Sequence, residues 1–349
     1  MASSEKHDNV KDYYGKVLTS TDGLKTSACS ARSAPHPVVC KIIRTQVPAA
    51  VNDRFFGCGN PIPLGISGMD VLDLGSGSGR DSYVAAALVG PAGSVTGIDM
   101  TEEQLQTARA NIPKLAETLG FEPKLRFLTG YIENLEAAGV APDSVDLCIS
   151  NCVVNLSPDK HAVLQSVFAS LRDGGEFHFA DMYADRTVPA HLADNKVLHG
   201  EGLAGALFVA EFERIAANVG FAAPPRILDA KRIDVFAPEL RMLVGDTQYY
   251  SVTYRLFKLP ASAASAAANV AVYKGSVAGC EDKYVLDIHN SFDAGVPTSV
   301  SAATAAVLEQ SWLARHFSLE PMAADDSSAA PTTSVTTATT TTLSMLQSL

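Results

Sequence analysis

The chain has 349 residues, with 27 Lys or Arg against 38 Asp or Glu, so its formal net charge at pH 7 is −11. An acidic chain repels a phosphate backbone, and a nucleic-acid partner is therefore disfavoured. The sequence has no run of 18 apolar residues, and its N-terminus lacks the apolar stretch of a secretory signal, so we expect no membrane span and a cytoplasmic protein. Six cysteines are too few for a disulfide scaffold in a chain of this length, which fits a reducing compartment.

The first 60 residues are polar and contain three of the cysteines. A helix is expected only after Pro37, and the Gly- and Pro-rich segment DRFFGCGNPIP at 53–63 is expected to be a loop. We treat residues 1–60 as an N-terminal segment that carries this cysteine loop.

Residues 61–221 alternate between short apolar runs and helical patterns. Strands are predicted at 69–74, 94–98, 125–129, 145–150 and 176–181, and helices at 80–89, 101–119, 159–171 and 187–221. A capping box at 101–104 is expected to begin the second of these helices. This alternation predicts an α/β fold with a doubly wound, mostly parallel sheet, whose ligand lies outside the carboxyl ends of the strands.

The C-terminal third changes character. Residues 222–320 contain short β-like runs at 252–258, 270–273 and 284–292 and a helical pattern at 302–317, which predicts a smaller α+β domain. Residues 321–349 are mostly Ala, Ser and Thr, and we expect a disordered tail because such a segment has little apolar surface to bury.

The strongest local signal is DLGSGSGRD at 73–81, which follows the first strand and opens the first helix. Its glycines let the backbone approach a ligand closely, and an acid just before them suits a cationic ligand group. Asp99 ends the second strand, where an acid can bind the hydroxyls of a ribose. A nucleoside with an amino-acid tail, S-adenosylmethionine, fits these features. A plain tight turn is the simpler alternative, and a nicotinamide dinucleotide is disfavoured because the G-x-G-x-x-G spacing is absent. The expected cofactor-binding residues are Asp73, Gly75, Ser76, Gly77, Gly79, Arg80, Asp81, Asp99, Met100, Ile132, Glu133 and Asn151.

Two cysteines occupy places that favour chemistry. Cys58 lies in the glycine-rich loop, and Cys152 follows Asn151 at the end of the fourth strand, where cofactor and substrate should meet. Either could instead be a small buried hydrophobe. The chain has no C-x-x-C pair, which argues against a structural zinc, but thiolates that meet in space could hold a soft, thiophilic ion. Cys148 is expected to lie in the core.

A series of motifs resembles one family. In chain order they are DYYGKVL, FFGCGNPIP, DLGSGSGRD, VTGIDMT, GYIENL, SNCVVNLSPDK, GGEFHFADMY and KVLHGEGLAGAL. Over residues 11–320 the chain resembles the arsenite methyltransferases, S-adenosylmethionine-dependent enzymes with the class I methyltransferase fold. The resemblance implies that Cys58 and Cys152 bind trivalent arsenic as thiolates, with Cys29 as a further candidate ligand. One departure concerns Gly202, because the family usually has a cysteine there.

The resemblance implies an enzyme that methylates arsenite and methylarsenite in arsenic detoxification. Since Gly202 removes one sulfur, a small thiol would fill the third place on arsenic, and a reductant of the glutathione or thioredoxin type would serve as co-substrate. Because arsenic(III) attacks through a lone pair, we expect no general base. The alternatives are a methyltransferase for another small-molecule nucleophile, a catalytically impaired metalloid-binding protein and an NAD-dependent oxidoreductase.

Overall fold

The computed structural model describes His7 and residues 35–55, 57–189, 191–192, 195, 198, 202–260, 269–321, 338–347 and 349. Cys29 lies outside the described residues, so its expected part in arsenic binding stays a prediction. In the described part of the chain, no helix is both long and apolar enough to cross a membrane.

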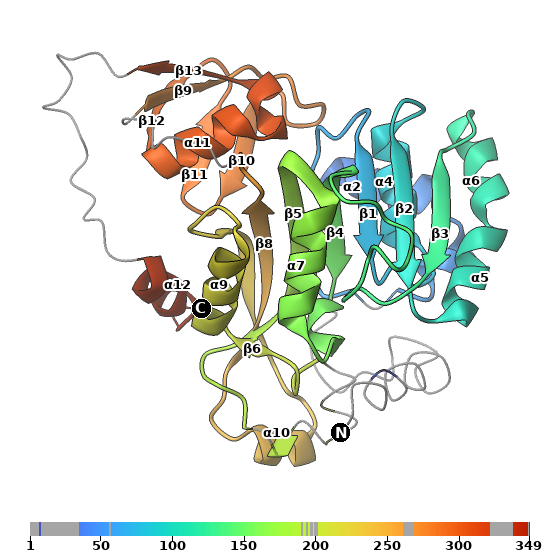
Figure 1. Cartoon of the computed structure of the whole chain (residues 1–349), viewed down its shortest axis with the longest axis vertical. Coiled ribbons are helices and arrows are strands. Elements are labelled where there is room, and N and C mark those ends of the chain that lie inside the picture. The colour runs from blue at the N-terminus through green and yellow to red at the C-terminus, as the bar shows by residue number, and fades with distance from the viewer. Residues whose placement is uncertain are drawn as a thin grey trace, which may run out of the picture.

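Within the described residues, an eight-stranded sheet crosses the molecule in the order β3-β2-β1-β4-β5-β8-β7, with β6 added beside β5 (Figure 1). The strands are β1 (Asp70–Leu74), β2 (Ser94–Asp99), β3 (Leu125–Thr129), β4 (Val145–Asn151), β5 (Leu171–Ala184), β6 (Leu207–Phe208), β7 (Arg226–Ile233) and β8 (Tyr249–Phe257). Strands β1 to β5 pair in parallel, whereas β8 is antiparallel to both β5 and β7. The mostly parallel sheet that the sequence predicts is confirmed.

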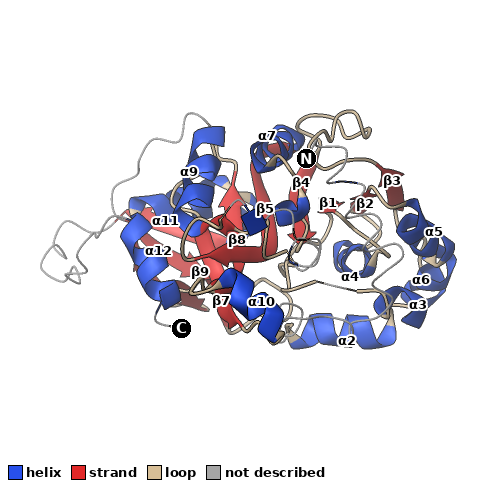
Figure 2. Cartoon of the chain, turned by 90° about the horizontal axis from the view of Figure 1, so that it is seen from below, coloured by secondary structure: helices blue, strands red, loops and turns tan. Residues whose placement is uncertain are grey.

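Helices cover both faces of this sheet (Figure 2). One face carries α2 (Pro37–Thr45) and α4 (Arg80–Val89), the other carries α7 (Lys160–Ser170) and α9 (Val209–Val219), and α3 (Ala49–Asn52), α5 (Glu102–Ala110) and α6 (Ile112–Leu119) lie toward the β3 edge. Successive side chains of a strand point to opposite faces. Val71 accordingly packs in the core on the α4 side, and Leu72 packs in the core on the α7 side. Burial on both faces explains why consecutive residues in the middle of β1 are apolar.

A smaller, sheet-rich region follows the main sheet. It contains β9 (Asn269–Tyr273), β10 (Lys283–Asp287), β11 (Asn290–Asp293), β12 (Pro297–Val300), β13 (Phe317–Pro321), α11 (Ala302–Gln310) and the 3-10 helix η5 (Trp312–His316). Glu176 of β5 connects it to the main sheet. Within that sheet, Arg255 of β8 donates to both carboxylate oxygens of Glu176 at 2.7 and 2.9 Å, and from η5 the Trp312 indole donates to Glu176 at 2.7 Å.

Three predictions need correction. The main sheet runs past residue 221, because β7 and β8 belong to it rather than to a separate C-terminal unit, and α10 (Pro238–Val244) connects them. The continuous helix expected over 187–221 is wrong, since β6 occupies 207–208 and α9 begins only at Val209. Residues 338–347, expected to be disordered, form α12, whose Leu346 is fully buried in the core cluster that contains α9.

Candidate functional site

The loop after β1 packs closely against the side chains of other segments at two of its glycines. Gly75 has φ +62°, and a Cβ there would lie 2.4 Å from the Val153 side chain. Gly79 has φ +94° and precedes α4, and a Cβ there would lie 2.8 Å from the Phe127 ring. Only glycine tolerates both the positive φ and the missing space. Gly75, Ser76 and Gly77 of this loop line a pocket at the carboxyl ends of β1, β2 and β4.

Two carboxylates line this pocket, Asp73, which is buried, and Asp99, which is half-buried. Asp99 accepts hydrogen bonds from the backbone N–H of Gly77 at 2.9 Å and of Thr101 at 2.7 Å, while Asp73 accepts one from the Ser82 hydroxyl at 2.5 Å. Burial raises the pKa of both, and the charge of Asp81 raises the pKa of Asp73 further, to well above its ordinary value. A cationic ligand group would relieve this crowding of negative charge.

The Thr101 side chain does not cap α5, because it hydrogen-bonds Asp99, so the expected capping box is wrong.

Two polar atoms of the pocket wall lack partners. The Ser76 hydroxyl and the Gln104 carbonyl oxygen are buried and have no hydrogen-bond partner among the described residues. Buried polar atoms are normally paired, so these two atoms are candidate hydrogen-bond partners for a bound ligand. With the carboxylates nearby, they fit a cationic nucleoside such as S-adenosylmethionine.

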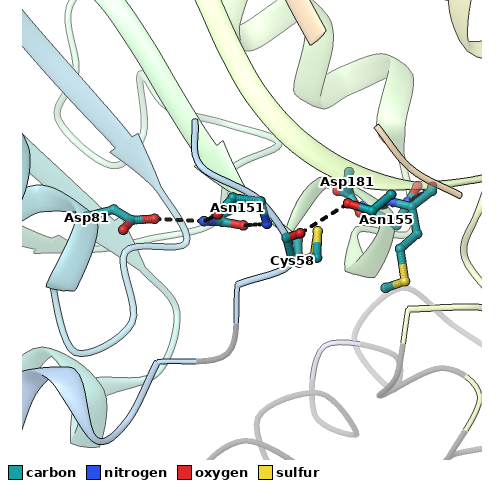
Figure 3. Close-up of a disulfide and its surroundings, with 9 residues drawn as sticks. Cys58, Asp81, Asn151, Asn155 and Asp181 are labelled. Carbon is teal, nitrogen blue, oxygen red and sulfur yellow. Dashed lines mark hydrogen bonds between the residues drawn. A yellow bond between two sulfur atoms is a disulfide. The ribbon is translucent and has the colours of Figure 1, made fainter. Parts of the chain in front are cut away.

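The two predicted thiolates meet, but as a disulfide. Cys58, in the loop before the sheet, is bonded to Cys152, at the end of β4, and their Cα atoms are 5.8 Å apart (Figure 3). Cys58 is fully buried, whereas Cys152 is half-buried and lines the pocket. The expectation of two free thiolates is therefore wrong for this state, because a disulfide offers no thiolate to a soft ion. Reduction would release two sulfurs at this place.

Hydrogen bonds hold the chain on both sides of the disulfide (Figure 3). On the Cys58 side, the Ser251 hydroxyl donates to the Cys58 carbonyl at 3.1 Å. After Cys152, the buried Asp181 carboxylate accepts from the backbone and the side chain of Asn155 at 3.0 and 2.8 Å. Burial raises the pKa of Asp181 to about 6. Asp181 thus fixes the turn that follows Cys152, a role that no sequence motif indicates.

Comparison with known proteins identifies the family. A family model described as "Methyltransferase domain" matches residues 66–220, and one described as "Arsenite methyltransferase C-terminal domain" matches residues 266–347. The arsenite methyltransferase of Mus musculus is 42% identical over 323 residues, which cover 92% of this chain and 85% of the mouse protein. That of Aquipseudomonas alcaligenes is 43% identical over 313 residues, which cover 89% of this chain and 90% of the bacterial protein. The chain belongs to the arsenite methyltransferase family.

A solved structure agrees with this membership. The crystal structure of an arsenic(III) S-adenosylmethionine methyltransferase from Chlamydomonas reinhardtii matches with a TM-score of 0.78 and 47% sequence identity, and the match covers 82% of this chain and 97% of that one. The resemblance, the class I methyltransferase fold and the assignment as a methyltransferase enzyme are therefore confirmed.

The structure brings most of the expected site residues together in this arsenite methyltransferase family member. Asp73, Gly75, Ser76, Gly77, Arg80, Asp81, Asp99, Met100, Ile132, Glu133, Asn151 and Cys152 all line the pocket. Gly79 lies behind the wall, at the start of α4, and Cys58 reaches the wall only through its bond to Cys152.

Further lining residues were not predicted. His7 contacts Glu133 at 3.0 Å, and Arg54, Phe55 and Gly57 belong to the cysteine loop. Position in that loop is a signal that could have indicated the last three.

The backbone at Gly202, where the family usually has a cysteine, suits glycine. A Cβ on Gly202 would lie 2.1 Å from the methyl carbon of Met182, and Gly202 has φ +78°. Met182 belongs to a buried apolar cluster against which Cys152 packs. No group of three His, Cys, Asp or Glu side chains suited to a metal ion occurs among the described residues.

The remaining described cysteines lie apart from the disulfide. Cys148 is fully buried, its sulfur lies 3.7 Å from the Ser170 hydroxyl, and burial raises its pKa to about 12, so its expected place in the core is confirmed. Cys40 is exposed on α2, and Cys280 is half-buried.

Proposed function

We propose that this protein transfers the methyl group of S-adenosylmethionine to trivalent arsenic held by the reduced thiolates of Cys58 and Cys152. The observation that carries the proposal is the meeting of these two sulfurs, from chain segments 94 residues apart, at the wall of a pocket lined by acids and glycines. Arsenic(III) is a soft ion, and thiolates are the protein ligands that such ions prefer. The arsenite methyltransferase relatives act on arsenite according to their names, which supports the same substrate here.

When bound, S-adenosylmethionine supplies a methyl group that is activated by a positively charged sulfur. The chain would hold this cofactor with Asp73, Asp99 and the glycine loop, and would aim the arsenic from the Cys58 and Cys152 side. Arsenic held by sulfur keeps a lone pair and carries no proton, so no side chain has to act as a general base. Placement is then the main contribution of the protein, and a well-oriented pair of reactants can gain roughly 7–11 kcal/mol.

A small thiol has two roles in this proposal. Two molecules of a thiol such as glutathione would reduce the Cys58–Cys152 disulfide to two thiols and leave as one small-molecule disulfide. A further thiol molecule would fill the third place on arsenic, because Gly202 offers no sulfur. We place this chemistry in the cytoplasm, where thiols stay reduced, and assign it to arsenic detoxification.

The test is an incubation of the protein with arsenite, S-adenosylmethionine and glutathione, with methylated arsenicals separated by chromatography. Cys58→Ser and Cys152→Ser should each abolish product, whereas Cys40→Ser, a change at an exposed free cysteine, should leave it intact. Undiminished methylation by both site variants would refute the proposal. Release of S-adenosylhomocysteine without arsenite would favour another nucleophile, and arsenite binding without any such release would indicate a metalloid-binding protein.

A further inference from the structure

One side chain links the two halves of the sulfur site. The Asn151 amide accepts a hydrogen bond from the Gly59 backbone N–H at 3.0 Å and donates one to the Gly59 carbonyl at 3.1 Å. The same amide nitrogen donates to the Asp81 carboxylate at 2.8 Å. Figure 3 shows Asn151 between Asp81 and the Cys58 loop.

Asn151 occupies a special place in the chain. It immediately precedes Cys152, and Gly59 immediately follows Cys58, so the amide joins the neighbours of both sulfurs. The contact is close, because a Cβ on Gly57 would lie 2.5 Å from the amide carbon of Asn151. A peptide group and a carboxamide have matching donors and acceptors, and no charged or aliphatic side chain can replace both bonds.

Reduction makes this link important. In the oxidised state, the disulfide itself holds Cys58 beside Cys152. Once the disulfide opens, the pair is held by noncovalent contacts, among them the two Asn151–Gly59 bonds and the Ser251–Cys58 bond. Arsenic needs both sulfurs close together and at a fixed position beside the cofactor pocket. The hydrogen bond to Asp81 connects Asn151 to the first turn of α4, which borders that pocket.

We propose that Asn151 is a positioning residue, which keeps the reduced Cys58 loop in place so that both thiolates bind one arsenic. This inference rests on the proposed arsenic ligation, and it reassigns a residue that the sequence suggested as a cofactor ligand. Each amide bond to the loop contributes modestly, so loss of both should weaken arsenite binding roughly 10- to 100-fold.

The test compares Asn151→Ala and Asn151→Asp with Asn134→Ala, an asparagine exposed in the loop after β3. Arsenite affinity of the reduced protein and S-adenosylmethionine affinity are each measured by titration calorimetry. Asn151→Ala should lose arsenite affinity by a clearly larger factor than cofactor affinity, and Asn134→Ala should change neither. Asn151→Asp should be at least as poor as alanine, because it keeps one acceptor, loses both donated bonds and faces Asp81 with a like charge.

A second readout does not use arsenic. In a glutathione redox buffer, the equilibrium constant for closing the Cys58–Cys152 disulfide reports how near the two thiols stay. This equilibrium constant should fall in Asn151→Ala by a factor similar to the loss of arsenite affinity. If the alanine variant does not fold, Asn151→Ser replaces it in the same measurement. Unchanged arsenite affinity and unchanged disulfide closure would overturn the inference, as would an equal loss of cofactor affinity. If the proposed function fails instead, wild-type protein does not bind arsenite, but disulfide closure still responds to Asn151.

Discussion

Asp73→Asn, which removes the charge of a pocket carboxyl, is the most informative single substitution. This carboxyl is 3% exposed, and burial together with the charge of Asp81 raises its pKa well above the ordinary value. Asp73→Asn keeps an acceptor for the Ser82 hydroxyl and removes the charge. If the carboxylate faces a cationic ligand, the loss of one charge-assisted hydrogen bond is worth about 1.5–3 kcal/mol, so S-adenosylmethionine should bind roughly 10- to 150-fold more weakly.

The same substitution should make the ligand-free protein more stable. A carboxyl with a raised pKa binds its proton more tightly in the folded state, so the free energy of unfolding falls as pH rises from the unfolded pKa to the folded one. Each unit of this difference corresponds to about 1.4 kcal/mol. Asp73→Asn removes this pH-dependent fall in the free energy of unfolding. The melting temperature of the variant should therefore exceed that of wild type by more at pH 8 than at pH 5.

Calorimetry at both pH values measures cofactor affinity, and thermal melting measures stability. Wild-type affinity should fall toward acid pH, because the proton on Asp73 competes with the cation, whereas the variant should show a flatter dependence. Asp282→Asn, at an exposed carboxyl in the C-terminal region, is the matched control and should change neither quantity. Unaltered cofactor affinity in Asp73→Asn, or a variant less stable than wild type at pH 8, would refute the reasoning.

Three further predictions concern other parts of the fold. Burial lowers the pKa of His178 to about 3, despite the adjacent Glu176. As pH falls below roughly 6.5, the unfolded chain therefore takes up a proton at His178 before the folded chain does, and the free energy of unfolding should fall by about 1.4 kcal/mol per pH unit. In His178→Met, the free energy of unfolding measured with urea should depend less on pH between pH 4 and 6. Gly202→Cys should lower the free energy of unfolding by roughly 1–3 kcal/mol in the same assay, mainly because position 202 has φ +78°; no destabilisation would contradict the geometry. Leu346→Ala should release α12 from α9 and speed proteolysis at the C-terminus, and an unchanged cleavage rate would show that the helix is not held by this side chain.

Sequence patterns located the parallel half of the sheet well. The strand predicted at 125–129 is β3, and the helix predicted at 80–89 is α4, because burial on both faces and glycines at the ends leave strong local signals. No strand is predicted at the position of β7, and the run at 252–258, which forms β8, is assigned to the wrong unit. The partner of β8 in the sheet is β5, and β7 pairs with β8; pairing across many residues leaves no mark in a local pattern. The buried Leu346 was missed for the same reason, because α9 supplies the surface on which it packs.

The candidate site was predictable in its parts but not in its connections. The acids, the glycines and Cys152 lie at strand ends, where an α/β fold gathers its ligand-binding residues, and Cys58 lies in the glycine-rich loop. The link from Asn151 to Gly59 joins positions 92 residues apart, and a family motif around Asn151 says nothing about that partner. The replacement of a family cysteine by Gly202 was visible in the sequence, but the Met182 side chain beside it depends on packing.

The most direct measurement of the central idea is arsenite binding to the fully reduced protein in the absence of small thiols. Wild type and Cys40→Ser should each bind one arsenite per chain with equal affinity, and Cys58→Ser and Cys152→Ser should each lose that binding. Equal stoichiometry and affinity in all four proteins would place the arsenic elsewhere and contradict the account.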